Sequence, residues 1–193
     1  MPYVITITGP SRAGKSTTLD YLLNYANDKF KPVIVPKYTT RSPRPDDTGE
    51  VLCQGVPNGC DLVYELYGER YGLKLSILFE LISNGQSPLV ILNDVRAVEE
   101  VRRVFKTLVR SVFVFRHNPT SDEYHQELIE FRGKKAAEPR FQKAPTFLRI
   151  YMENLHLFDY VIINSGTKFE LNLQVAQIVD RLEDPNWPLR NRR

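Results

Sequence analysis

The first residues whose types and spacing could do chemistry are Gly9, Gly14, Lys15 and Ser16, which fit the pattern GxxxxGK[ST] without a mismatch. Glycines allow a backbone to curl around crowded phosphates with its N–H groups pointing inward. Lys15 would open a helix whose N-terminal amides face those phosphates, and Ser16 could offer its hydroxyl to Mg²⁺. The stretch predicts a triphosphate-binding loop. The alternative is an ordinary glycine turn between a strand and a helix.

Basic residues gather in two further stretches. Arg41 and Arg44 lie in YTTRSPRP, where the neighbouring prolines would stiffen them, so they could clamp a phosphate in bidentate fashion. The stretch from 132 to 145 could close as a lid over a transferring phosphoryl group. Its cations are Arg132, Lys134, Lys135, Arg140 and Lys143. The alternative for both stretches is a solvated basic loop.

Asp94 follows the apolar run PLVILN and so stands at the carboxyl end of a predicted strand. A phosphate-loop enzyme places a carboxylate there, near Mg²⁺ or substrate. Aspartate is also a common N-cap, and Asp94 precedes the helical stretch VRAVEEVRR. The residues alone leave both roles open.

The elements that must position these residues alternate along the chain. The predicted strands are 3–8, 33–38, 89–93, 111–115 and 160–164, and the predicted helices are 15–26, 95–105, 121–130 and 169–182. This alternation predicts an α/β fold of the P-loop NTPase type, with a parallel sheet covered by helices on both faces. Ligands of such sheets bind at the carboxyl ends of the strands, where the phosphate loop would lie.

Two stretches interrupt the alternation and suggest a division of the chain. We expect a core of residues 1–38 and 85–183 that includes the lid, at about 131–145 and turn-prone. We expect residues 39–84 to form a small β-rich insertion that binds the acceptor, and residues 184–193 to form a flexible tail. Within the insertion, strands at 61–67 and 70–73 would meet at a Gly68-Glu69 turn, followed by a helix at 73–83.

Composition narrows the class of partner. The net charge of +3 over 193 residues suits a protein that handles small anions and falls short of the basic stripe that nucleic-acid binding needs. We expect no membrane span and no signal peptide, hence a cytoplasmic protein. Cys53 and Cys60 match no zinc pattern and are expected to be free thiols. The sequence leaves the oligomeric state open.

With these motifs in order, the chain resembles the guanylate kinase family of nucleoside monophosphate kinases. GPSRAGKST resembles that family's GPSGxGKST, TTRSPRP its TTRxPRxxE motif, and ERYGL its NxYGT turn. VILNDVRAVEEV is similar to ILDIDxQGVxxV, and FDYVIIN to FDYxIxN. The similarity spans nearly the whole chain in the right sequence of motifs.

The resemblance implies transfer of a phosphoryl group from ATP, with Mg²⁺, to a small nucleotide, most simply GMP or dGMP. It implies a catalytic role for Lys15, Arg132 and either Arg140 or Lys143. The implied ATP-binding residues are Gly9, Ser11, Arg12, Ala13, Gly14, Lys15, Ser16, Thr17 and Asn164, with Ser16 also on the metal. The implied acceptor-binding residues are Lys37, Arg41, Arg44, Glu65, Tyr71 and Asp94. Of these, Glu65 and Asp94 would accept hydrogen bonds from the guanine ring.

The chain departs from the family pattern at four points. Arg12 occupies a glycine position, and Lys37 and Leu73 replace hydroxyl residues that read the base. A phosphate-binding tyrosine has no clear counterpart, and most of the segment before the NxYGT turn is missing. Two alternatives therefore stand beside GMP. One is a kinase of another phosphorylated small molecule, such as ribose 1,5-bisphosphate. The other is a non-catalytic guanylate-kinase-like module that binds a protein.

Overall fold

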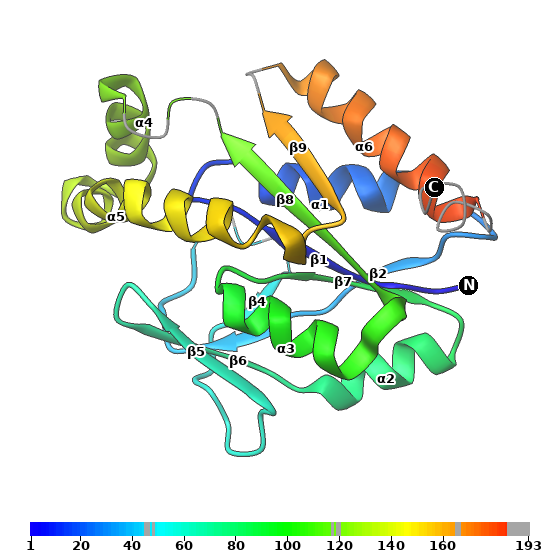
Figure 1. Cartoon of the computed structure of the whole chain (residues 1–193). Coiled ribbons are helices and arrows are strands. Elements are labelled where there is room, and N and C mark those ends of the chain that lie inside the picture. The colour runs from blue at the N-terminus through cyan, green and yellow to red at the C-terminus, as the bar shows by residue number, and fades with distance from the viewer. Residues whose placement is uncertain (45–46, 48, 117, 119–120, 165–166, 185–193) are drawn as a thin grey trace.

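The computed structural model describes residues 1–44, 47, 49–116, 118, 121–164 and 167–184. It has an α/β fold, with a five-stranded parallel sheet and a smaller mixed sheet (Figure 1). The strands of the large sheet are β1 (Val4–Thr8), β2 (Pro32–Ile34), β7 (Ser87–Ile91), β8 (Val109–Arg116) and β9 (Tyr160–Asn164). Their order is β2-β7-β1-β8-β9, and every neighbouring pair is parallel. The predicted fold class is confirmed.

Helices cover both faces of the large sheet (Figure 1). One face packs against α1 (Lys15–Asn24) and α6 (Lys168–Glu183), and the other against α2 (Leu75–Ser83) and α3 (Val95–Phe105). Alternating residues of one strand serve the two faces, because successive side chains point to opposite sides. Ile5 and Ile7 belong to the first cluster and Val4 to the second. Short 3₁₀ turns at Lys106–Leu108 and Leu155–Leu157 lead into β8 and β9.

The smaller sheet holds β3 (Lys37–Thr39), β4 (Val51–Leu52), β5 (Leu62–Leu66) and β6 (Glu69–Leu73), in the order β4-β3-β6-β5. Strands β5 and β6 form a hairpin in which Leu66 pairs with Glu69, so its turn is Tyr67-Gly68. Both turn residues have positive φ, 54° and 79°, as a type I′ turn requires. The predicted Gly68-Glu69 turn was wrong by one residue.

Two predicted elements of this region differ in the structure. The single strand expected at 33–38 is split between the two sheets. Val35 still donates to Leu89, but Pro36 has no N–H to continue the ladder. The helix expected at 73–83 begins at Leu75, whose N–H donates to the Asp61 carboxylate at 2.8 Å, while Leu73 stays in β6. Pro36 is therefore the point at which the chain passes from the large sheet to the small one.

The stretch from 132 to 145 was predicted to be turn-prone, but it is helical, so that prediction was wrong. Helix α4 (Asp122–Arg132) ends at Gly133, and α5 (Lys134–Glu153) follows at once, with Pro139 and Pro145 inside it. Prolines normally break a helix because they remove a hydrogen bond and crowd the preceding turn. Here apolar packing between the two helices outweighs that cost, through a small cluster built on Tyr124, Leu128, Ala137 and Ala144.

Apart from Asp184, the predicted tail lies outside the described residues. Within the described ranges, no helix is both long enough and apolar enough to cross a membrane.

Candidate functional site

The loop between β1 and α1 lies at the carboxyl end of the central strand and is packed tightly from two sides. A Cβ atom at Gly9 would lie 2.3 Å from the Val114 carbonyl oxygen, so only glycine fits there. Gly14 has a φ of 98°, and a Cβ atom would lie 2.8 Å from Asn164 Nδ2. That same Asn164 amide donates to the Ala13 carbonyl at 2.8 Å. The loop is thus held by β8 and by the end of β9.

The first turn of α1 is suited to bind an anion. Among the residues that the structure describes, no side chain caps this helix, and Thr18 N–H makes a helical hydrogen bond to Gly14 O at 2.8 Å. The amides of the preceding residues, Lys15, Ser16 and Thr17, stand in the positions that have no partner within a helix. Such amides and the helix dipole attract phosphates. The Ser16 hydroxyl in the same turn is the hard oxygen ligand that Mg²⁺ prefers, so these residues fit a bound Mg²⁺–ATP.

Lys15 lies beside this turn and donates from its ammonium to the Pro10 carbonyl at 2.6 Å. Burial and the positive charge of Arg132 lower the pKa of Lys15 to about 8, and Glu50 partly opposes them. A cation from the predicted lid and a carboxylate from the insertion therefore both lie near the phosphate loop.

Arg12 belongs to the same loop but its side chain lies against α4. Its backbone has a φ of 59°, the left-handed conformation that favours glycine. The guanidinium lies 3.8 Å from the Glu127 carboxylate and 4.3 Å from the centre of the Phe131 ring. The Arg132 guanidinium lies 4.4 Å from the centre of that ring. Arg12, predicted among the ATP-binding residues, thus connects the loop to the lid.

Lys37 and Tyr71 lie together, near Lys15. The Lys37 side chain is only 2 % exposed, and its ammonium donates to the Ile91 carbonyl and lies 5.4 Å from the centre of the Tyr71 ring. Burial and the charge of Lys15 lower the pKa of Lys37 to about 7. Tyr71 stacks on Tyr64 with ring centres 5.4 Å apart.

Arg41 and Arg44 are ordered by one carboxylate. Asp47 forms an ion pair with the buried Arg41 guanidinium and accepts the Arg44 backbone N–H at 2.9 Å. Burial and the neighbouring charge of Arg41 lower the pKa of Arg44. Two guanidinium groups close enough to repel each other form a site that an anion would stabilise.

The two carboxylates expected to read guanine are placed differently. Glu65 is exposed, and it alternates along β5 with the buried Tyr64, so it faces away from the Tyr64–Tyr71 stack. Asp94 caps α3, accepting Arg96 N–H at 2.8 Å, and forms a 3.0 Å ion pair with the Arg96 guanidinium. The structure therefore does not bring Glu65 to Lys37 and Tyr71, and the Asp94 carboxylate is engaged by its own helix.

The lid cations Arg140 and Lys143 meet at one aromatic ring. The Arg140 guanidinium lies 4.5 Å from the centre of the Tyr67 ring, and the Lys143 ammonium lies 5.9 Å from it. Tyr67 stands at the tip of the β5–β6 hairpin, so the insertion and α5 are in contact at this point. The structure brings both candidates for the second lid cation to the same place.

A cavity of about 30 Å³ separates the phosphate loop from an aromatic cover. Its lining residues are Gly9, Pro10, Ser11, Lys15, Leu66, Tyr67, Asn93, Phe147 and Tyr151. Sequence reasoning missed Tyr67, Asn93, Phe147 and Tyr151, as well as the nearby Tyr64 and Asp47. Within the described part of the chain, the buried Asn93 Oδ1 has no hydrogen-bond partner. The signal for Asn93 was its place next to Asp94 at a strand end; Tyr67 gave no comparable signal.

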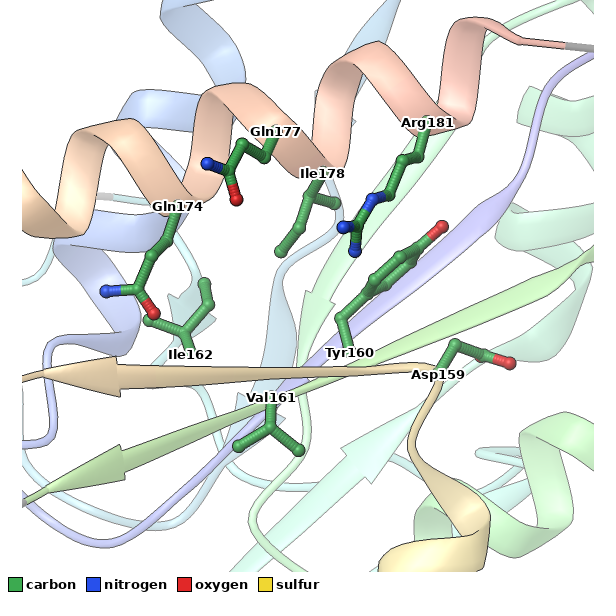
Figure 2. A pocket seen from close by; sticks show the side chains of 8 residues that line it. All are labelled: Asp159, Tyr160, Val161, Ile162, Gln174, Gln177, Ile178 and Arg181. Carbon is green, nitrogen blue, oxygen red and sulfur yellow. The ribbon is translucent and has the colours of Figure 1, made fainter. Parts of the chain in front are cut away.

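A larger pocket of about 180 Å³ lies elsewhere, between β9 and α6 (Figure 2). Gln174 lies at one end of it and Arg181 and Asp159 at the other. Gln174 bonds the backbone of the edge strand, donating to Ile163 O and accepting from Ile163 N, both at 2.9 Å. Asp159 is held by Arg102 at 2.7 Å. These side chains serve the packing of β9, and we assign no chemistry to this pocket.

Comparison with known proteins gives a consistent answer. The chain is 26% identical over 173 residues to a guanylate kinase of Chlamydia caviae, covering 84% of this chain and 80% of that protein. It is 27% identical over 199 residues to a guanylate kinase of Clostridium perfringens, covering 94% and 87%. The crystal structure of guanylate kinase from Anaplasma phagocytophilum matches 96% of this chain and 88% of that one, with a TM-score of 0.66 and 18% identity. No family model matches the sequence.

Proposed function

Because the chain is a distant member of the guanylate kinase family, we propose that it is an ATP- and Mg²⁺-dependent kinase that phosphorylates a nucleoside monophosphate, with GMP or dGMP as the expected acceptor. One observation carries the proposal. Lys15 stands at the start of α1, and both Lys15 and Arg41 lie close enough to Lys37 to lower its pKa. Two phosphate sites side by side are what transfer between two phosphates requires.

On the donor side, the amides of α1 and the Lys15 ammonium would bind the β- and γ-phosphates. Ser16 would hold Mg²⁺, which when bound neutralises charge on the phosphates. Asn164, which fixes Ala13, would lie beside the donor base. Lys15 would leave the Pro10 carbonyl for the phosphates, and the charge of those phosphates would raise its lowered pKa.

On the acceptor side, Arg41, Arg44 and Tyr71 would orient the attacking phosphate. An oxygen of that phosphate forms a bond to the γ-phosphorus, and the bond from the γ-phosphorus to the β,γ-bridging oxygen breaks. ADP leaves with the electron pair of that bond, and the product carries one more phosphate. No general base is needed, because a phosphate dianion is already nucleophilic. The cations Arg132, Arg140 and Lys143 would stabilise the charge that spreads over the transferring group.

A second acceptor class is favoured by a specific observation. Glu65 faces solvent and the Asp94 carboxylate caps α3, so neither carboxylate is aimed at a guanine edge, whereas the cations Lys37, Arg41 and Arg44 are gathered. This arrangement favours binding of the acceptor's phosphate groups over recognition of a nucleobase. A phosphorylated small molecule other than a nucleotide, such as ribose 1,5-bisphosphate, is therefore the second candidate.

The test is release of ADP with ATP and Mg²⁺ against GMP, dGMP, AMP, CMP, UMP and ribose 1,5-bisphosphate. We expect GMP or dGMP to be turned over orders of magnitude faster than the others. Lys15→Ala should abolish turnover in a folded protein, while Lys29→Ala, an exposed lysine, should leave it unchanged. A faster rate with the bisphosphate would move the proposal to the second class. Undiminished turnover by Lys15→Ala would reject the phosphate-loop mechanism.

A further inference from the structure

Tyr67 is the point at which three parts of the molecule meet. It lies in the turn between β5 and β6, and its ring packs edge-on against Phe147 of α5, with ring centres 5.6 Å apart at 80°. The guanidinium of Arg140 lies 4.5 Å from the ring centre and the ammonium of Lys143 lies 5.9 Å from it. One side chain of the insertion thus touches both candidate cations of the lid helix.

The same side chain lies over the phosphate loop. Tyr67, Ser11 and Lys15 line the cavity of about 30 Å³. Burial raises the pKa of the Tyr67 hydroxyl, and the nearby Ser11 side chain acts against that rise. The backbone of Tyr67 has a φ of 54°, a conformation that residues other than glycine rarely adopt. The contacts with the lid and the loop are the interactions that hold the side chain there.

We propose that Tyr67 is a positioning residue for phosphoryl transfer, which brings Arg140 and Lys143 to the phosphate loop when the acceptor-side hairpin is docked. The inference rests on the proposed kinase function and extends it to a residue outside the family motifs. A cation over an aromatic face is attracted by the ring quadrupole, and the attraction grows where water is excluded. The hairpin and the lid would therefore close together, and ATP would meet the lid cations only when the acceptor side is closed.

The ring of Tyr67, rather than its hydroxyl, makes the contacts with the two cations. A variant that keeps the ring and a variant that removes it should therefore behave differently. Tyr67→Phe keeps the ring and should retain kcat within about 2-fold. Tyr67→Leu keeps apolar bulk but has no π-system, and should lower kcat by about 10-fold. The dissociation constant for Mg²⁺–ATP should not change in either variant, because the α1 amides and Lys15 do not depend on the ring. Val63→Ala is the matched control, since Val63 lies on the same hairpin and is 46 % exposed.

A double-mutant cycle tests whether the ring acts through the cation. If Tyr67 positions Arg140, then Arg140→Met and Tyr67→Leu should each slow transfer, and the double variant should be little slower than Arg140→Met alone. Independent, multiplying effects would overturn the proposal. So would a Tyr67→Leu protein that transfers phosphate as fast as the unmodified protein or faster, since the ring would then only cover the loop.

Hydrogen exchange of α5 separates failure of this inference from failure of the proposed function. Tyr67→Leu should speed amide exchange in α5 of the ligand-free protein, while Tyr67→Phe and Val63→Ala should not. If α5 responds in this way but no acceptor is phosphorylated, the kinase proposal is wrong, and so is the proposed positioning role of Tyr67 in phosphoryl transfer. If the protein is an active kinase and Tyr67→Leu changes neither α5 exchange nor kcat, the inference about Tyr67 alone is wrong.

Discussion

Lys37 is a buried cation with another lysine nearby. Its pKa falls to about 7 because burial and Lys15 disfavour the charged form, and Glu50 offsets this only in part. Near neutral pH the Lys37 side chain of the ligand-free protein is therefore partly in its neutral amine form. An anion bound there would favour the charged form, so acceptor binding and protonation of Lys37 should support each other.

This lowered pKa gives the stability of the protein a definite pH dependence. The lysine pKa is 10.5 in the unfolded chain and about 7 for Lys37 in the fold, so the unfolded state binds more protons between these values. The free energy of unfolding should therefore rise from pH 7 to pH 9, by on the order of 1 kcal/mol per pH unit. Urea unfolding at several pH values measures this slope.

Two variants test whether Lys37 causes the rise of the free energy of unfolding with pH. Lys37→Met should flatten it without abolishing it, because Lys15, with a pKa of about 8, contributes in the same direction. Lys29→Met removes an exposed lysine and should leave the slope as it was. An unchanged slope in Lys37→Met would show that this ammonium titrates as an ordinary lysine.

At the scale of single residues, the sequence was informative where a local motif fixes the backbone. The glycines and Lys15 were found from the loop pattern, and Arg41 and Arg44 from their proline-stiffened spacing, while their roles in binding stay predictions. Glu65 could not be placed in this way, because its direction depends on the hairpin register, and a shift of one residue moves a side chain to the other face. Asp47, which orders both arginines, is separated from Arg44 by a Pro-Asp pair and carries no motif of its own.

At the scale of single elements, β6 is tightly packed at Gly72. A Cβ atom there would lie 2.5 Å from Val56 Cγ1 and 2.8 Å from Cys60 Sγ. Because Gly72 follows Tyr71 in the strand, a shift of the strand that relieves this clash would also move the ring that stacks on Tyr64. The packing behind β6 and the position of Tyr71 are thus coupled.

Gly72→Ala should weaken acceptor binding selectively. We expect the KM for the acceptor to rise and the KM for ATP to stay unchanged, with a loss of roughly 1–3 kcal/mol in stability from overpacking. Steady-state kinetics with each substrate varied in turn measure the two constants. Adding Val56→Ala makes room for the new methyl group and should restore part of the loss. An equal rise in both KM values would show that the damage is not confined to the acceptor side.

The helices and strands were predictable where the local sequence pattern favours the same structure as the tertiary packing. Apolar strands alternating with helical segments gave the large sheet and its covering helices. Helix α5 was missed because Pro139 and Pro145 argue against a helix locally, and only its packing on α4 argues for one. The split of the predicted strand 33–38 was missed because the β-forming residues on either side of Pro36 were joined into one strand, although the proline marks the break.

At the scale of the whole molecule, strand order fixes where the parts of the site meet. β7 and β8 lie on opposite sides of β1, so the chain crosses from one side of the sheet to the other around the central strand. In open parallel sheets this arrangement leaves a crevice at the carboxyl ends of the strands. The loop between β1 and α1 lies at that edge, and the β5–β6 hairpin meets α5 beside it at Tyr67.

Mg²⁺–ATP should therefore stabilise the entire fold. A ligand at 100 times its dissociation constant should raise the melting temperature by about 5–10 °C for a chain of this size. Thermal unfolding with and without Mg²⁺–ATP measures the shift, which EDTA should reduce. Lys15→Ala should show little or no shift, and an equal shift in that variant would mean that the nucleotide binds away from the phosphate loop.

The hydrogen bond from Asn164 to Ala13 joins residues 151 positions apart. A ribosome makes about 5–20 residues per second, so on the order of 10–30 s pass between synthesis of the glycine loop and synthesis of the side chain that fixes it. During that interval the nascent chain carries a phosphate-loop sequence whose conformation this contact does not yet secure. Nucleotide binding should therefore wait until β9 has been synthesised, although the sequence of the glycine loop is made 151 residues earlier.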